Sequence, residues 1–146
     1  MNLHQNALII KAVKFENYFN EISFIRNKVF VEEQKIPKNL EWDDQDQIAH
    51  HFIVSSEQHN IIAYARLLPS GKLGRVAVLK QWRRQGIGSL LISAICKKAT
   101  KLDINTLTLS SQLSAVDFYL QSGFQIFGDV FLEAGIKHRS MLKTLK

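Results

Sequence analysis

The sequence predicts a single α/β domain in which a mixed β-sheet is covered by helices. Its 146 residues can bury one substantial core, and no linker, repeat or low-complexity tract divides them. Apolar, β-branched runs typical of strands alternate with helical patterns in the order β-α-β-β-β-α-β-α-β-β. Strands followed by helix–strand crossovers imply a mixed sheet with helices packed on it.

The first half of the chain is expected to contain one helix and four strands. An apolar run at residues 7–13 predicts the first strand. Ile22, Ile25 and Val29 recur at helical spacing and predict a helix over residues 21–34, which Pro37 stops. The other predicted elements are a polar loop at 38–47, hairpin strands at 51–55 and 61–68 around a turn at 57–60, a turn at 69–71 and a strand at 72–79.

The second half is expected to contain two helices and three short strands. Apolar residues fall on one face of a helix that begins at the glycines near residue 88 and runs to about residue 100. Ser114 and Asp117 resemble a capping box, which predicts a short helix that Gly123 closes. The predicted strands cover 106–110, 125–127 and 140–145, and a predicted loop covers 131–138.

The turn that joins the strand at 72–79 to the next helix is a candidate anion site. A strand that leads through a Gly-rich turn into a helix presents free backbone N–H groups at the positive end of that helix. Gly86 and Gly88 have no Cβ, so the backbone can approach a phosphate closely. Arg83 and Arg84 precede the turn and supply forked donors suited to phosphate oxygens. Walker-type loops and dinucleotide fingerprints fit poorly, because the residues after Gly88 are not those that either motif requires.

Composition narrows the class of protein. The hydrophobic share of 46% and the charged share of 22% are typical of soluble globular proteins, and no apolar run reaches membrane-spanning length. The N-terminal segment lacks the layout of a signal peptide, and the single cysteine, Cys96, fits a reducing compartment, so we expect a cytoplasmic protein. We expect no metal site, because His50 and His51 are adjacent on a predicted strand and point to opposite faces.

The net charge of +6 is unevenly distributed along the chain. Residues 1–60 carry six Lys/Arg and nine Asp/Glu, which gives a net charge of −3. Residues 61–146 carry thirteen Lys/Arg and four Asp/Glu, which gives a net charge of +9. A phosphorylated cofactor on the basic half and a cationic substrate near the acidic half would account for this division. Nucleic-acid binding is an alternative, but the basic residues are scattered and lack interleaved aromatic residues. A solvated charged surface is a third interpretation.

Three motifs stand out in the chain. The first is Arg-x-x-Gly-x-Gly after a Val-rich strand, and it comprises Arg83, Gly86 and Gly88. The second comprises Ala115, Phe118-Tyr119 and Gly123-Phe124. The third comprises Val29-Phe30, Glu33-Gln34, Pro37, Glu41, Asp43, Asp46, Ala49 and His51, with Phe131, Glu133, Ala134-Gly135-Ile136, His138 and Met141 near the end. Together these motifs make the chain resemble the GNAT superfamily of acyl-CoA-dependent N-acetyltransferases. The second motif is similar to the superfamily signature after the fifth core strand, and the third resembles the ElaA/YjcF-type branch. The resemblance spans roughly residues 24–141 and implies a mixed, mostly antiparallel central sheet flanked by helices on both faces.

The resemblance implies acetyl-CoA, or coenzyme A, as the co-substrate. The backbone N–H groups of residues 84–89 would hold its pyrophosphate, and its pantetheine arm would pair with the strand at 76–78 as an added strand does. An N–H of the same strand would stabilise the tetrahedral oxyanion. The expected cofactor-binding residues are Val76, Ala77, Val78, Arg83, Arg84, Gln85, Gly86, Ile87, Gly88, Ser89 and Gln112, the last at a position where many members carry Asn.

The resemblance also assigns catalytic roles. Tyr119 holds the position of the general acid that protonates the leaving thiolate. A tyrosine pKa of about 10 and a thiol pKa of about 8.5 make this transfer feasible once the site tunes the tyrosine. The base that deprotonates the incoming ammonium is left open among four residues, and we prefer Glu33 and Glu133 over His138 and His51 because both lie in motifs of the branch.

The leading hypothesis is an N-acetyltransferase that acts on a primary amine of a small molecule or peptide. The acidic residues at 41–46 are candidates for attracting a cationic acceptor. The alternative is a non-catalytic acyl-CoA-binding regulatory domain that keeps the glycine loop but lacks a productive amine pocket. We expect neither a nucleic-acid nor a membrane partner, and the resemblance makes a homodimer plausible.

Overall fold

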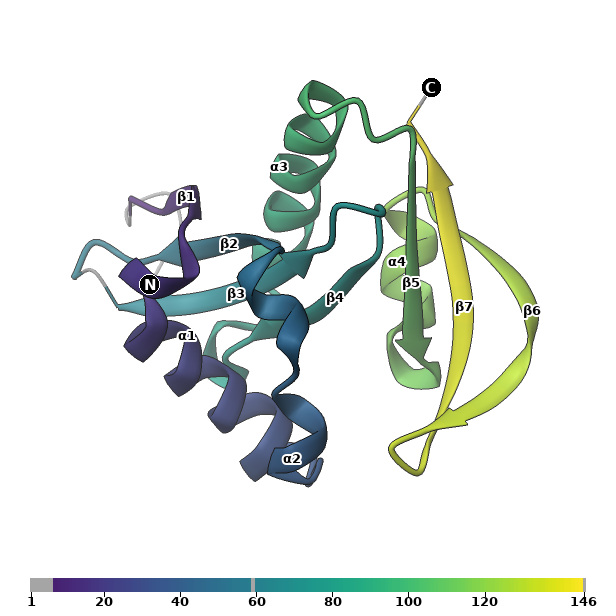
Figure 1. Ribbon diagram of the computed structural model, residues 1–146, viewed down its shortest axis with the longest axis horizontal. Helices are drawn as coiled ribbons and strands as arrows, with labels where there is room; N and C mark the ends of the chain where they lie inside the picture. Colours follow the sequence, from purple (N-terminus) through teal and green to yellow (C-terminus); the bar gives the residue numbers. More distant parts are fainter. Residues whose placement is uncertain (1–6, 59, 146) are drawn as a thin grey trace.

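A computed structural model describes residues 7–58 and 60–145, whose strands form two separate sheets (Figure 1). The first sheet has the antiparallel order β1-β2-β3-β4, and the second has the antiparallel order β5-β7-β6. In chain order the elements are β1 (Ile9–Val13), α1 (Phe19–Arg26), a π-helical segment (Asn27–Glu33), α2 (Lys38–Glu41), β2 (His50–Ser55), β3 (Ile61–Leu67), β4 (Leu73–Val78), α3 (Ile87–Lys101), β5 (Thr106–Gln112), α4 (Val116–Gln121), β6 (Gln125–Glu133) and β7 (Ile136–Thr144). The predicted turn at 57–60 includes His59, which lies outside the described residues.

The first sheet is buried on both faces, because the side chains of its central strands alternate between two apolar clusters. Phe52 and Val54 belong to the cluster that contains the apolar face of α3. Ile53 and Tyr64 belong to the cluster that contains the apolar face of α1. Figure 1 shows α1 and α3 on opposite faces of this sheet. The predicted fold class, a mixed and mostly antiparallel sheet with helices on both faces, is confirmed.

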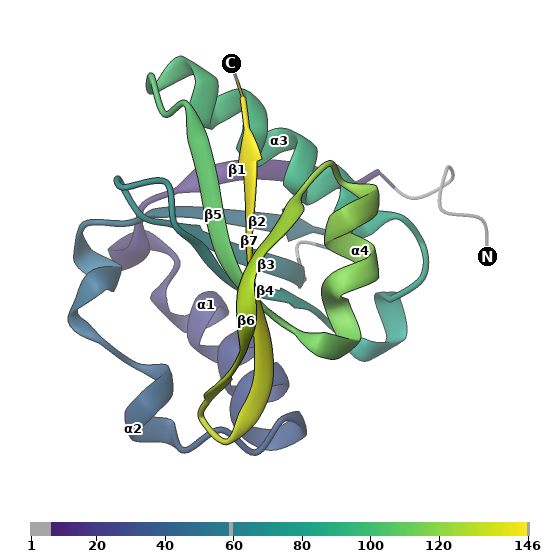
Figure 2. The ribbon, with the colours of Figure 1, turned by 90° about the vertical axis from the view of Figure 1, so that its right-hand side faces the viewer.

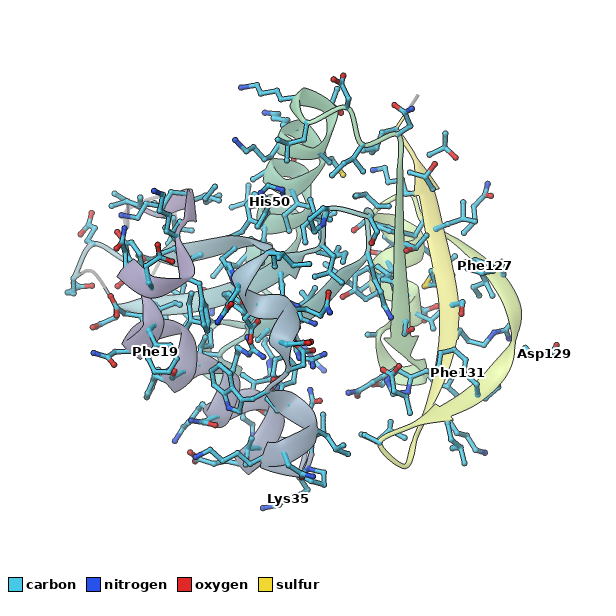
Figure 3. All side chains as sticks on the ribbon, in the orientation of Figure 1. Phe19, Lys35, His50, Phe127, Asp129 and Phe131 are labelled. Atoms are coloured by element: carbon cyan, nitrogen blue, oxygen red, sulfur yellow. The ribbon has the colours of Figure 1, made fainter. Side chains whose placement is uncertain are left out.

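The second sheet corrects the prediction of a loop at residues 131–138. β6 and β7 instead continue as a long hairpin, in which Glu133 pairs with Ile136. The turn between them has positive φ at both central residues, 52° at Ala134 and 76° at Gly135, as a type I′ turn requires. Alanine seldom adopts positive φ, so the sequence carries only half of the usual signal for this turn. Figure 2 looks onto this sheet from the side opposite the first sheet, and Figure 3 shows Asp129 on the outer side of β6.

Three further predictions need correction. The helix predicted over 21–34 changes after Arg26 into a π-helical segment, in which the N–H of Gln34 donates to the carbonyl of Val29 at 3.0 Å. The predicted polar loop contains α2 and a 3₁₀ turn (Asp44–Gln47). No side-chain hydrogen bond caps α4, so the predicted capping box of Ser114 and Asp117 is absent, because a 3₁₀ turn (Leu113–Ala115) precedes the helix.

Candidate active site

The candidate active site lies where the two sheets separate. β4 and β5 run parallel and join at one bridge, between Lys72 and Thr108, where the N–H of Thr108 donates to the carbonyl of Gly71 at 3.0 Å. Beyond that bridge, within the described chain, β4 pairs only with β3 and β5 pairs only with β7. The facing edges of β4 and β5 therefore present unpaired backbone groups to the space between them, as sheet edges do.

A cavity of about 950 Å³ extends from this separation to the π-helical segment and the β6–β7 turn. Val76 of β4 and Ser111 of β5 line its walls, and Tyr119 of α4 lines it from one side. Glu133 and His138 line it from the β6–β7 hairpin. The two sheets thus bring together residues from β4, β5, α4 and the hairpin, which are up to 65 positions apart in the sequence. We refer to this cavity as the cleft.

Tyr119, the predicted general acid, is 8% exposed and packs edge-to-face against Phe118 and Phe124, with ring centroids 5.0 and 5.6 Å away. Burial raises the pKa of Tyr119 above its ordinary value, so the hydroxyl keeps its proton at neutral pH, but this shift is away from the thiol pKa and not toward it as the expected tuning requires. Gly123, at φ 94°, closes α4 behind it, and the N–H of Phe124 donates to the carbonyl of Tyr119 at 3.0 Å. The helix end and the aromatic contacts together fix the ring.

The glycine turn takes the conformation expected of a helix-start anion site. Gly86 is the N-cap of α3 at φ 81°, and no side-chain hydrogen bond caps this helix end. Its first N–H groups therefore remain available for an anion. Arg84, at φ 60°, is also left-handed. The two glycines differ in their surroundings: nothing lies within 4 Å of a Cβ placed at Gly86, whereas a Cβ at Gly88 would lie 3.0 Å from the ring of Phe118. Gly88 thus allows α4 to pack against the start of α3.

Two of the predicted site residues form a pair with each other. Arg83 binds Glu33 through both terminal nitrogens, at 2.6 and 2.7 Å, and its Nε donates to the carbonyl of Val78 at 2.8 Å. These hydrogen bonds lower the pKa of Glu33, which makes it a weaker base. The geometry favours a role for this pair in fixing the end of β4 to the π-helical segment. Gln112, another predicted cofactor contact, donates from Nε2 to Oε1 of Gln34 at 2.7 Å.

The two histidines considered as bases have different surroundings. His51 is 1% exposed, and its Nε2–H donates to the carbonyl of Asp46 at 2.8 Å while Nδ1 accepts from the Tyr64 hydroxyl at 2.6 Å. It does not line the cleft. His138 lines the cleft, and its Nδ1 lies 2.6 Å from the carbonyl of Ile136. Because a carbonyl only accepts, Nδ1 carries the proton and Nε2 has a free lone pair.

Nε2 of His138 lies 3.7 Å from Oε2 of Glu133, whose side chain is 53% exposed. The ring of His138 also stacks on Phe131, with centroids 5.8 Å apart. The hairpin that the sequence did not predict therefore holds these two candidate groups side by side at the cleft.

Three of the four acidic residues at 41–46 do not form a free cation-attracting surface, contrary to the sequence-based hypothesis, and the fourth, Asp44, is exposed and lies outside their cluster. Three carboxylates and three guanidinium groups alternate in a largely buried cluster, which we call the guanidinium–carboxylate cluster. Its members are Arg26, Glu41, Asp43, Asp46, Arg66 and Arg75. Opposite charges are equal in number within it, so it offers little net attraction to a cationic acceptor.

Arg26 and Arg66 carry the buried part of this cluster. Arg26 is completely buried and contacts Glu41 at 3.0 Å and Asp46 at 2.7 Å. Arg66 contacts Asp43 at 2.7 Å and Asp46 at 3.0 Å. Although burial opposes it, the hydrogen bond and charge of Arg66 lower the pKa of Asp43. No local pattern indicates these pairings, because the arginines are 15 to 23 positions from their partners in the sequence.

The third arginine, Arg75, lies within β4 at φ 53°, where a β-bulge interrupts the strand. Tyr64 pairs with Ala77 and Arg66 pairs with Gly74, so two residues of β4 oppose one residue of β3. No pattern in the sequence indicates a left-handed arginine inside a strand.

Neither a metal site nor a membrane span is found in the described part of the chain. No group of three or more His, Cys, Asp or Glu side chains among residues 7–58 and 60–145 could hold a metal ion. None of the helices described there is long and apolar enough to cross a membrane.

Comparisons with known proteins identify the family to which this chain is similar in sequence and fold. A family model described as an acetyltransferase (GNAT) domain matches residues 19–145. The chain is 32% identical over 139 residues to the uncharacterized N-acetyltransferase YjcF of Bacillus subtilis, covering 92% of this chain and 99% of YjcF. The crystal structure of a putative N-acetyltransferase from Lactobacillus plantarum matches with a TM-score of 0.88 and 27% identity, covering 96% and 99% of the two chains. Escherichia coli ElaA matches with a TM-score of 0.82 and 25% identity, covering 92% and 99%.

The chain therefore belongs to the acetyltransferase (GNAT) family, and within it to the ElaA/YjcF-type branch. The family implies a CoA-type co-substrate, and the residues present fit one. The uncapped start of α3 suits a phosphate group, and the unpaired edge of β4 suits an extended amide-bearing arm.

Proposed function

We propose that this protein transfers an acetyl group from acetyl-CoA to a primary amine of a small molecule or peptide. The observation that carries the proposal is the cleft itself, where an unpaired strand edge, a buried tyrosine and a histidine–carboxylate pair meet. The proposal extends the family assignment to a particular acyl group, acceptor and set of catalytic residues.

The chain binds the co-substrate mainly through its backbone. The N–H groups of residues 86–89 at the start of α3 hold the pyrophosphate, with Gly86 leaving room for its approach. The free edge of β4, from Val76 to Val78, pairs with the pantetheine amides and directs an N–H at the thioester carbonyl. Because Arg83 and Gln112 are engaged with Glu33 and Gln34, their side chains position the cleft walls.

The reaction forms one bond and breaks one. The free amine attacks the thioester carbon, a C–N bond forms, and the C–S bond breaks as the tetrahedral oxyanion collapses. Tyr119 gives its proton to the departing thiolate, and the second proton, which the nitrogen loses as the amide forms, returns to the tyrosinate directly or through water. His138 accepts a proton from the incoming ammonium through Nε2, directly or through water, and Glu133 stabilises the imidazolium that forms. The bonding of Glu33 to Arg83 makes it the less suitable base.

Amine-dependent thiol release from acetyl-CoA tests this proposal. Wild type and Tyr119→Phe are compared with a panel of primary amines, including polyamines, amino sugars, aminoglycosides and lysine peptides. We expect Tyr119→Phe to lower kcat about 10²-fold or more while the affinity for acetyl-CoA changes little, since general acid catalysis contributes typically 10²–10⁴-fold. Tyr18→Phe removes a hydroxyl from outside the cleft and is the matched control.

The outcomes separate the possible functions. Unchanged turnover in Tyr119→Phe would remove this residue from the general-acid role. Acetyl-CoA binding by calorimetry without thiol release for any amine would favour the non-catalytic acyl-CoA-binding alternative. No binding of acetyl-CoA would refute the proposed co-substrate.

A further inference from the structure

We propose that Arg75 is a positioning residue for acyl transfer, which it serves by holding the β4 bulge in a left-handed conformation. This inference rests on the proposed function, because the backbone that it positions is the strand edge assigned to the thioester carbonyl. The guanidinium of Arg75, a residue that itself lines the cleft, acts on the strand through Glu41 and Asp43.

The bulge is a conformation that β4 would not adopt by preference. Arg75 has φ 53°, which disfavours a residue with a Cβ by roughly five- to thirtyfold in population. Glycine would adopt this backbone without that cost, and Gly74 stands one position earlier. An arginine at this position therefore needs contacts that compensate for the disfavoured backbone.

Arg75 makes several such contacts, and Glu41, which accepts most of them, is itself held in place. Nε of Arg75 donates to Oε2 of Glu41 at 3.1 Å, and Nη2 donates to the Glu41 carbonyl at 3.0 Å and to Oδ2 of Asp43 at 3.2 Å. Glu41 is 2% exposed and is held in turn by Arg26, which is completely buried. The side chain of Arg75 is 25% exposed, so water screens the contact only in part. Within the guanidinium–carboxylate cluster, Arg75 is the member that belongs to β4.

The bulge lies directly before the strand edge that is proposed to bind the thioester, so the contacts of Arg75 affect the orientation of that edge. Val76 follows Arg75 directly and lines the cleft, and the edge of β4 that faces β5 has no strand partner there. A bulge rotates the backbone of the residues that follow it, so the conformation at Arg75 sets the direction of the Val76 amide. Donors that stabilise an oxyanion lose effect steeply when their direction changes.

Replacing Arg75 with alanine or with glycine distinguishes the effect of losing the side chain from the effect of straining the backbone. Both Arg75→Ala and Arg75→Gly delete the anchor, but only glycine keeps the left-handed conformation without strain. We expect Arg75→Ala to lower kcat about tenfold with a smaller change in the KM for acetyl-CoA, and Arg75→Gly to stay within about threefold of wild type.

Asp103 provides a matched control pair, because it is also a non-glycine residue at positive φ, 60°, and it lies beyond the end of α3. Asp103→Ala and Asp103→Gly should differ in thermal stability in the same direction as the Arg75 variants, with no difference in kcat. Equal losses in Arg75→Ala and Arg75→Gly would overturn the inference and assign the guanidinium a direct role. Full turnover in Arg75→Ala would also overturn it.

A readout without turnover distinguishes failure of this inference from failure of the proposed function. The amide ¹H–¹⁵N resonances of Val76 and Ala77 report their backbone directly. We expect them to shift in Arg75→Ala and to stay near their wild-type positions in Arg75→Gly, whether or not any amine is acetylated. Unshifted resonances in Arg75→Ala would refute the anchor, even in an enzyme whose substrate is found.

Discussion

Replacing Arg26 with methionine should destabilise the protein strongly, because it removes the only fully buried cation of the guanidinium–carboxylate cluster. Its guanidinium donates to Oε2 and the carbonyl of Glu41, at 3.0 and 2.8 Å, and to Oδ1 of Asp46 at 2.7 Å. It also lies 4.2 Å from the ring centroid of Trp42. Methionine can replace the apolar stem but none of these donors, so two buried carboxylates each lose one partner.

The size of the effect follows from that loss. Breaking a buried ion pair by removing one partner costs about 3–5 kcal/mol. An unfolding entropy of about 2.1 cal/mol/K per residue gives roughly 0.3 kcal/mol/K for a chain of this length, so we expect the Tm to fall by about 10–16 °C. Thermal unfolding followed by circular dichroism at pH 7 measures it.

Lys28→Met is the matched control. Lys28 and Glu32 form an exposed pair one helical turn apart, with N–O distance 3.6 Å and side chains 56% and 62% exposed. Such pairs contribute about 0.3–0.5 kcal/mol, so the Tm should change by about 1–2 °C. A loss in Arg26→Met as small as that in Lys28→Met would refute the idea that the cluster is a buried electrostatic unit.

The pH dependence of Arg26→Met gives a second check. Burial already raises the pKa of Glu41, and removing Arg26 should raise it further. Glu41 would then take up a proton as the pH falls, which removes the unpaired charge. The stability difference between wild type and Arg26→Met should therefore be smaller at pH 5 than at pH 7. A difference that grows on acidification would contradict this mechanism.

Two further predictions concern other parts of the fold. Burial lowers the pKa of His51 below its ordinary value of about 6.5, so the unfolded chain binds the proton more readily and stability should fall as the pH drops below about 6.5, by at most about 1.4 kcal/mol per pH unit. Denaturant unfolding at pH 7 and pH 5 should show a smaller pH effect in His51→Gln than in wild type, and an equal effect would exclude His51 as the cause. Gly88→Val places side-chain atoms against the ring of Phe118 and should cost about 1–3 kcal/mol, whereas Ser93→Val on the exposed face of α3 should change stability by less than about 0.5 kcal/mol. Calorimetric unfolding of both variants measures this contrast, and similar values would show that α4 does not need the glycine.

The elements that the sequence predicted well are those with local causes. The strand, turn and helix around Gly86 depend on apolar spacing and on a glycine at positive φ, and all three are adjacent in the chain. The closure of α4 at Gly123 is local in the same way. The position of Tyr119 could be inferred because the motif around it encodes both the helix end and the aromatic contacts that bury it.

The features that the sequence did not predict depend on contacts between distant segments. The hairpin turn at Ala134 is held by strand pairing along β6 and β7, which overrides the poor preference of alanine for positive φ. The left-handed Arg75 donates a hydrogen bond to Glu41, 34 positions away. Neither residue carries a local signal for its backbone.

Charge shows most clearly why long-range contacts change a functional interpretation. The acidic stretch at 41–46 gave the first half of the chain its negative charge, and in isolation it resembles a cation-binding surface. Folding places an arginine beside three of its four carboxylates, Glu41, Asp43 and Asp46, and two of these, Glu41 and Asp43, bind Arg75 of β4. Among the cleft-lining carboxylates in the described chain, Glu133 is the one that no guanidinium contacts. An ammonium group that enters the cleft would therefore find the carboxylate without a guanidinium partner at Glu133. This carboxylate lies beside His138, the histidine proposed to deprotonate the ammonium.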